Sequence, residues 1–255
     1  MSPRPNPARP VRAVFFDAGN TLFREHPMRW EIYASVAREF GMRFDADRMR
    51  AEMIRAHAAL PIRVDGSFRY TNGWFRAYVA EVFRPLGAAE AELPAIAERL
   101  FATFRDRRSF FVFPEVDEVT RALRARGLVL AVISNWSPRL PRLLEDLSLA
   151  DRFDFTLCSA IEEVEKPDPE IFARALARGG VEPAEAVHVG DSAEKDVAGA
   201  LAAGIAPALL DREGPRGLEG DMADPETDAT PETDGRVAHV RDLRGLLPLV
   251  EGRLR

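Results

Sequence analysis

Several polar residues of this sequence lie just after separate apolar stretches. They carry carboxylates, one ammonium group, and hydroxyl or amide groups. These residues are Asp17, Thr21, Ser134, Asn135, Lys166, Asp191 and Asp196. Carboxylate oxygens are ligands that Mg²⁺ prefers, commonly together with the oxygens of a substrate phosphate. An ammonium group and hydroxyl or amide donors can bind the phosphate oxygens. If the fold gathers these side chains, they suit a site for a phosphate and a divalent metal.

Apolar segments of strand length alternate with amphipathic segments of helix length, and these elements would position the polar residues. The expected strands are 11–17, 128–134, 153–158, 186–190 and 206–210. The expected helices between and after them are 115–126, 139–147, 169–178, 193–203 and 243–254. This alternation predicts an α/β fold, a Rossmann-like parallel sheet with helices on both faces. Ligands bind at the carboxyl ends of such strands, so we expect the polar residues to meet at that edge.

Between residues 24 and 108 the pattern is helical, and no segment there reads as a strand. We expect an inserted all-helical cap, 24–108, within a discontinuous core formed by 11–23 and 109–255. Residues 1–10, rich in Pro and Arg, predict a disordered tail, and the acidic segment 211–235 predicts a flexible loop. The helical spacing of the aromatic residues in the insertion favours core positions over a substrate pocket. Those aromatic residues are Trp30, Tyr33, Phe68, Tyr70, Trp74, Phe75 and Tyr78.

Composition argues for a soluble globular protein and against two classes of partner. Of the 255 residues 46% are hydrophobic and 30% are charged, and the formal net charge is −6. A negative net charge argues against nucleic-acid binding, which needs a basic surface. With no apolar run long enough to cross a bilayer and no signal peptide, we expect no membrane partner and a cytoplasmic location. The one cysteine, Cys158, lies in an apolar stretch and is expected to be a packed thiol, and nothing in the sequence indicates the oligomeric state.

Four motifs in this sequence resemble, in the same order, those of the haloacid dehalogenase-like hydrolases. They are Phe-Phe-Asp-Ala-Gly-Asn-Thr-Leu at 15–22, Val-Ile-Ser-Asn at 132–135, Glu-Lys-Pro-Asp-Pro-Glu-Ile-Phe at 165–172 and Val-Gly-Asp-Ser-Ala-Glu-Lys-Asp at 189–196. The helical insertion after the first motif is similar to the inserted cap of that family. The resemblance covers nearly the whole chain after the N-terminal tail. It implies an Mg²⁺-dependent phosphatase that acts on a small phosphorylated metabolite.

The resemblance also implies a role for each motif residue. Asp17 would be the nucleophile that forms an aspartyl-phosphate, which is an established use of a carboxylate. Lys166 would neutralise the phosphate charge and hold Asp17. The residues implied to bind the phosphate are Thr21, Ser134, Asn135 and Lys166. The implied metal ligands are Asp17, the backbone carbonyl of Gly19, Asp191 and, either directly or behind another ligand, Asp196.

The first motif departs from the phosphatases of the family at Gly19. In those enzymes the residue two after the nucleophile is a second aspartate, which passes protons to the leaving group and from water. Such proton transfer contributes about 10²–10⁴-fold to the rate. We therefore expect slow turnover of poor leaving groups, unless Glu25, His26 or another residue of the insertion supplies the proton. Restoring an acid with Gly19→Asp is expected to raise the rate if only the proton transfer is missing.

Two alternatives remain beside a phosphatase. Gly19 is also compatible with a binding or regulatory protein of low turnover. The 2-haloacid dehalogenases of the family likewise lack the second aspartate, because halide leaves unprotonated. They do not need Mg²⁺, however, tend to lack the Gly-Asp-Ser motif found here at 190–192, and carry a bulky residue in place of Gly19.

Overall fold

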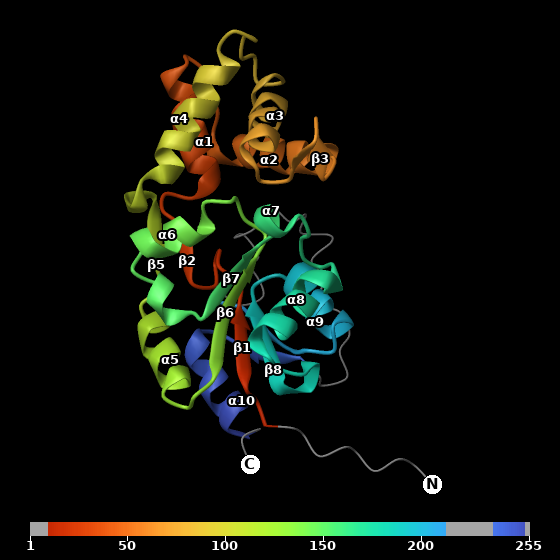
Figure 1. Cartoon of the computed structure of the whole chain (residues 1–255). Coiled ribbons are helices and arrows are strands. Elements are labelled where there is room, and N and C mark those ends of the chain that lie inside the picture. The colour runs from red at the N-terminus through yellow and green to blue at the C-terminus, as the bar shows by residue number, and fades with distance from the viewer. Residues whose placement is uncertain (1–9, 213–236, 253–255) are drawn as a thin grey trace.

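The structure, a computed structural model, describes residues 10–212 and 237–252. A six-stranded sheet lies at its centre, in the order β10-β9-β8-β1-β6-β7, and all neighbouring strands are parallel (Figure 1). Its strands are β1 (Ala13–Phe16), β6 (Val129–Ser134), β7 (Phe155–Cys158), β8 (Ala186–Gly190), β9 (Ala206–Leu210) and β10 (Ala238–Val240). The parallel sheet confirms the expected fold class, and β10 is a strand that the sequence did not indicate. The expected tail 1–10 and loop 211–235 lie outside the described residues, except for Pro10, Asp211 and Arg212.

Helices cover both faces of the sheet, as the sequence predicts for buried parallel strands. They are α5 (Glu115–Arg124), α6 (Leu140–Asp146), α7 (Ser159–Glu162), α8 (Pro169–Gly179), α9 (Gly199–Ala202) and α10 (Leu246–Gly252). Strand β1 shows how the two faces arise, because alternate residues of a strand point in opposite directions. Val14 and Phe16 belong to the core that includes α5, α6 and α10, whereas Ala13 and Phe15 belong to the core that includes α8 and α9.

Single turns of helix join several of these elements. They are η1 (Arg107–Ser109), η2 (Ala150–Arg152), η3 (Pro183–Glu185) and η5 (Leu243–Gly245), and a longer π-helix, η4 (Ala193–Ala198), precedes α9. The segment 193–203, expected as one α-helix, is thus divided into η4 and α9. None of the helices in residues 10–212 and 237–252 has both the length and the apolar content that crossing a bilayer requires.

Four helices form a separate group beyond the carboxyl end of the sheet (Figure 1). They are α1 (Arg29–Glu39), α2 (Ala46–Ala59), α3 (Asn72–Phe83) and α4 (Leu93–Arg105). This group has its own apolar core, whose largest fully buried side chains include Trp74, Tyr33 and Phe83. We propose that it acts as the cap expected from the sequence.

The expectation of a purely helical insertion is wrong in the interior of the insertion, between its second and third helices. A hairpin of two short strands, β3 (Arg63–Val64) and β4 (Ser67–Phe68), lies between α2 and α3. Its turn residues, Asp65 and Gly66, have φ angles of 46° and 77°, as a tight two-residue hairpin turn requires. The Asp-Gly pair was the available signal for a hairpin turn. Strands of two residues, however, are too short to show an alternation of apolar and polar residues beside it.

The insertion leaves and re-enters the core through a two-stranded antiparallel ribbon. Strand β2 (Phe23–Glu25) pairs there with β5 (Phe110–Val112). The rings of Phe23 and Phe110 pack edge to face, with centroids 5.7 Å apart. The ribbon lies at the domain boundaries expected near residues 24 and 108, and it places Glu25 beside the edge of the sheet that carries the motif residues.

Candidate active site

Residues from four loops at the carboxyl edge of the sheet line one cavity. Of the residues singled out from the sequence, it contains Asp17, Gly19, Ser134, Asn135, Lys166, Asp191 and Asp196. The insertion and nearby loops add Glu25, Arg29, His57, Tyr70, Asn20, Trp136 and Lys195. The convergence follows from the topology, because β1 lies between β6 and β8 and all three strands end at the same edge.

Lys166 lies at the centre of this arrangement and is only 2% exposed. Its Nζ donates to Asp17 Oδ1 at 2.6 Å and to Asp196 Oδ1 at 2.5 Å. Burial acts to lower the pKa of Lys166, but the two carboxylates outweigh it and raise the pKa above its ordinary value. The side chain is therefore an ammonium ion held between two carboxylates.

Asp196 supports Lys166 and has both carboxylate oxygens engaged. Oδ1 also lies 2.8 Å from His188 Nε2, and Oδ2 accepts from the backbone N–H of Ser192 at 3.1 Å. Burial alone would raise the pKa of Asp196, but Lys166 and His188 together hold it well below the ordinary value. Of the two roles open for Asp196, these contacts favour a residue behind the ligands that positions Lys166.

Asp17 stands at the end of β1, where its backbone N–H donates to the carbonyl of Val189 at 2.8 Å. The residue is 7% exposed. Burial raises the pKa of Asp17, and the hydrogen bonds from Lys166 and Ser134 offset only part of that effect. A carboxylate with so little hydration is a better nucleophile than one in bulk water.

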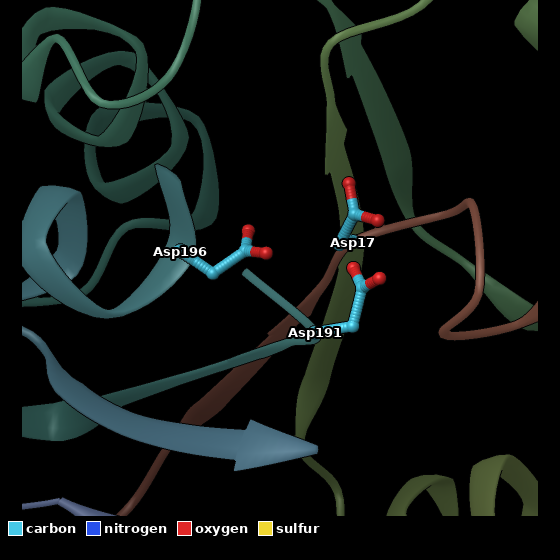
Figure 2. A group of neighbouring side chains, drawn as sticks. All are labelled: Asp17, Asp191 and Asp196. Carbon is cyan, nitrogen blue, oxygen red and sulfur yellow. The ribbon is translucent and has the colours of Figure 1, made fainter. Parts of the chain in front are cut away.

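The acidic residues of the cavity fit a divalent cation. Asp17, Asp191 and Asp196 each offer a carboxylate oxygen, and these oxygens lie within 4.8 Å of one another. Figure 2 shows the three side chains approaching from β1, the end of β8 and η4. Asn20 Nδ2 donates to Asp191 Oδ2 at 3.1 Å and orients that carboxylate. With Asp196 occupied by its own partners, Asp17 and Asp191 are the side chains suited to hold the ion.

Two of the residues expected to bind phosphate, Asn135 and Thr21, have different surroundings from those that the sequence implied. Asn135 donates from Nδ2 to the carbonyl of Lys166, and its Oδ1 accepts from the backbone N–H of Lys166, both at 2.8 Å. Its amide group therefore fixes the Lys166 loop. Thr21 is completely buried and is not among the residues that line the cavity. Within the described part of the chain its Oγ1 has no hydrogen-bond partner.

The space beside Gly19 is filled by the indole of Trp136. A Cβ atom added at Gly19 would lie 3.0 Å from Cζ3 of that ring. The indole packs edge to face on Phe23, with centroids 5.6 Å apart, and the guanidinium of Arg29 lies 5.5 Å from its centre. The position that holds an acid in related phosphatases is thus covered here by an aromatic side chain.

A second, largely apolar pocket adjoins this cavity, and both are lined by Glu25, Arg29, Tyr70, Asn135 and Trp136. Its remaining walls are mostly aromatic and include Tyr33, Trp74, Phe75, Tyr78, Phe101, Phe104 and Phe110. The expectation that the aromatic residues of the insertion are core residues holds for the buried Tyr33, Trp74 and Tyr78, but these three also line the pocket. Core packing and pocket lining are therefore combined in the same side chains.

Two further residues that support the site were missed in the sequence. His188, in the middle of β8, is completely buried, and burial lowers its pKa, so that a neutral ring donates from Nε2 to Asp196. Arg212 donates to the backbone carbonyls of Asn20 and Thr21 at 3.0 and 2.7 Å and holds the loop after β1. His188 reads as part of an apolar strand and Arg212 as part of an acidic segment, so neither carried a signal.

Cys158 is the packed thiol that its apolar surroundings indicate. It is 1% exposed, and its Sγ lies 3.0 Å from the backbone carbonyls of Trp136 and Ser137. Burial raises the pKa of Cys158 to about 12. A thiol with this pKa is protonated at neutral pH and is not a nucleophile.

Comparison with known proteins agrees with the geometry of the site. The family model described as haloacid dehalogenase-like hydrolase matches residues 11–204. Haloacid dehalogenase-like hydrolase domain-containing protein 3 of Bos taurus is 35% identical over 215 residues, which cover 82% of this chain and 84% of that protein. A phosphoserine phosphatase of Thermus thermophilus is 39% identical over 225 residues, 79% of this chain and 89% of that enzyme.

Solved structures of similar fold include a 2-haloacid dehalogenase, which is the other kind of hydrolase considered for this chain. The crystal structure of a 2-haloacid dehalogenase from Pseudomonas syringae has a TM-score of 0.64 and 27% sequence identity, and the match covers 96% of this chain and all of that one. Phosphatases and dehalogenases thus share the fold, and the parallel sheet alone does not distinguish them. This chain belongs to the haloacid dehalogenase-like hydrolases.

Proposed function

We propose that this hydrolase is an Mg²⁺-dependent phosphatase that acts on a small phosphorylated metabolite through an aspartyl-phosphate on Asp17. The observation that carries this proposal is the presence of Asp17, Lys166 and Asp191 in one cavity. An attacking carboxylate, an ammonium group and a cation-binding acid are what transfer of a phosphoryl group requires. A dehalogenase would need the first two but would have no use for Asp191 beside Asp17.

The side chains of the cavity divide the work of the reaction. Asp17 attacks phosphorus, and Lys166 holds Asp17 and balances the charge of the transferred group. Ser134 orients Asp17 through the hydrogen bond between their side chains. A bound Mg²⁺ would be held by Asp17 and Asp191 and would supply positive charge opposite the phosphate oxygens. The carbonyl of Gly19 remains a proposed ligand, and Thr21 and Asn135 act by shaping the loops around the site.

The adjoining aromatic pocket supports a substrate whose leaving group has a flat or apolar part. Its walls are mainly apolar. Of its charged side chains, Glu25 and Arg29 neutralise each other, with Arg29 Nε donating to Glu25 Oε1 at 3.0 Å, and Arg139 is the third. The similarity to a phosphoserine phosphatase makes phosphoserine a natural comparison compound. Aromatic walls favour phosphate esters of aromatic alcohols over phosphoserine, because a zwitterionic group loses hydration there without enough charged partners.

Hydrolysis of p-nitrophenyl phosphate by the full chain, in Mg²⁺ and in EDTA, tests the proposed function. We expect turnover that depends on Mg²⁺ and a phosphoenzyme that can be trapped by acid quench. A panel of phosphate esters, with phosphoserine and one 2-haloacid included, then defines the substrate class. Release of halide in EDTA together with no phosphatase activity would overturn the proposal in favour of a dehalogenase.

Gly19→Asp alone is now expected to give no gain in rate, in contrast to the expectation from the sequence. The φ angle of Gly19 lies outside the left-handed region, so the backbone would accept a side chain, but the Trp136 indole occupies the space. If no other residue of the cavity transfers the proton, Gly19→Asp combined with Trp136→Ala should exceed Trp136→Ala alone by about 10- to 100-fold in kcat, towards the range of general acid–base catalysis. Steady-state rates on phenyl phosphate measure this effect.

Trp136→Ala is the reference for that comparison, because any change in substrate binding caused by loss of the indole is present in both variants. If Gly19→Asp by itself gives the full gain, the indole does not obstruct the position. If the double variant gains nothing over its reference, the slow step is not the missing proton transfer.

A further inference from the structure

Two residues of the insertion, Tyr70 and His57, form a hydrogen-bonded pair in the wall of the catalytic cavity. Tyr70 lies between β4 and α3, and His57 lies in the last turn of α2. His57 Nε2 is 3.2 Å from the Tyr70 hydroxyl, and the two rings stack with centroids 6.1 Å apart. Both residues line the cavity that contains Asp17, Lys166 and Asp191. A phenol and an imidazole joined in this way can pass a proton between the cavity and the ring.

The backbone at Tyr70 is held in an unfavourable conformation. Its φ angle is 66°, in the left-handed region that costs a bulky residue about 1–3 kcal/mol. The flanking residues fix this geometry, since Arg69 N–H donates to the carbonyl of Ile62 at 2.8 Å and Thr71 N–H donates to that of Phe68 at 3.0 Å. Strain of this kind is retained mainly where it places a functional group.

The hairpin that precedes Tyr70 is bound to the loop that carries Lys166. Arg69 Nη1 donates to Glu165 Oε1 at 3.0 Å, and the two side chains are 18% and 15% exposed. A second, exposed pair joins Arg63 of the hairpin to Glu163 at 2.7 Å. Because Arg69 and Glu165 are the immediate neighbours of Tyr70 and Lys166, this contact fixes the tyrosine relative to the catalytic lysine.

The other candidates for proton transfer fit the role less well. Glu25 is already engaged, because Arg29 donates from Nε and from Nη2 to its Oε1. His26 is exposed and is not among the residues that line the cavity. Gly19 has no side chain, and Trp136 covers its position.

We propose that Tyr70, with His57 behind it, is the general acid and base of this enzyme and replaces the acid that Gly19 lacks. This inference rests on the proposed phosphatase function. When the bond from Asp17 to phosphorus forms and the bond to the leaving oxygen breaks, that oxygen takes the proton of Tyr70, and protonated His57 restores it. When water attacks phosphorus and the bond to Asp17 breaks, the proton of water passes to Tyr70 and a proton returns to His57.

Leaving-group dependence in the full-length protein tests this role. p-Nitrophenolate leaves without a proton, whereas the phenolate of phenyl phosphate is a poorer leaving group that benefits from one. Tyr70→Phe should therefore lower kcat/KM for phenyl phosphate by about 10²-fold and that for p-nitrophenyl phosphate by less than about threefold. With p-nitrophenyl phosphate the variant should also accumulate phosphoenzyme, because water then attacks without a base. His57→Gln keeps a hydrogen-bonding group near Tyr70. It should show the same difference in kcat/KM between the two esters, to a smaller extent.

Tyr78→Phe is the matched control, because it removes a hydroxyl from the same aromatic group, one that donates to the carbonyl of Met53 at 3.1 Å. It should change both esters by the same factor. Two results would overturn the proposal. One is an equal loss of kcat/KM on both esters in Tyr70→Phe, and the other is a wild-type kcat/KM that falls steeply as the leaving group becomes poorer. Asp17→Asn separates this outcome from failure of the proposed function. If Asp17→Asn abolishes both activities while Tyr70→Phe shows no bias, only the role of Tyr70 is wrong.

Discussion

Replacing Asp17 by asparagine should lower kcat by roughly 10³- to 10⁶-fold, the range seen when a nucleophile is removed from a hydrolase. The amide has nearly the shape of the carboxylate, so the cavity keeps its form, but it cannot form an acyl phosphate. Rates on p-nitrophenyl phosphate in Mg²⁺ and an acid-quench search for phosphoenzyme measure the effect. A variant that retains a tenth or more of the wild-type rate would contradict the assignment of the nucleophile.

The same substitution should not destabilise the protein when Mg²⁺ is absent. Burial raises the pKa of Asp17 above its ordinary value, and Lys166 offsets only part of this. A carboxyl group whose pKa is raised by folding favours the folded state while it is protonated, and that contribution is lost as the pH rises. At neutral pH the ionised Asp17 therefore costs stability, and the neutral amide removes the cost.

Thermal unfolding in EDTA at pH 7 should accordingly show Asp17→Asn melting at or above the temperature of the wild type. The difference should shrink as the pH falls towards the ordinary pKa of aspartate, because the wild-type carboxyl then becomes neutral as well. Added Mg²⁺ should stabilise the wild type more than the variant, since it binds the folded state through Asp17. A variant that melts several degrees lower in EDTA would show that the ionised carboxylate contributes to the fold.

The sequence predicts this fold well because each central strand is a continuous apolar run. Val14 and Phe16 pack into one core and Ala13 and Phe15 into the other, so β1 is apolar on both faces and reads as a buried parallel strand. Once the strands are parallel, the residues after them must meet at one edge. The convergence of Asp17, Lys166 and Asp191 was therefore predictable from the order of the elements.

The partner of each polar side chain was not predictable, because partners depend on distances that a linear pattern does not contain. Asp196 is saturated by Lys166 and by His188, whose neighbours in β8 are all apolar. Asn135 lines the cavity, but both atoms of its amide group bond the backbone of Lys166. The residues of the insertion were hardest of all to place, since Tyr70 lies in a turn after two-residue strands and its neighbour Arg69 contacts Glu165, 96 positions away.

The buried positive charge of Lys166 has two roles. Lys166 pairs with two buried carboxyl groups, that of Asp17, the proposed nucleophile, and that of Asp196. The pKa of Asp196 is lowered by its partners, so its stabilising contribution is present above the ordinary pKa and lost only in acid. The pKa of Lys166 is raised, so its contribution is complete at neutral pH and lost only in strong base. The proposed catalytic role of Lys166 and its structural role therefore belong to the same side chain.

Lys166→Met should consequently destabilise the protein by about 3–5 kcal/mol and also abolish turnover, because it leaves two buried carboxylates without a cation. Their mutual repulsion should raise both carboxyl pKa values further, so the variant should gain more stability than the wild type between pH 7 and pH 5. Urea unfolding at both pH values measures this. Lys166→Met/Asp196→Asn should recover part of the lost stability but none of the activity, since one unpaired charge is removed and the catalytic ammonium is still missing. If the single variant is as stable as the wild type at pH 7, the buried charges do not depend on Lys166 for compensation.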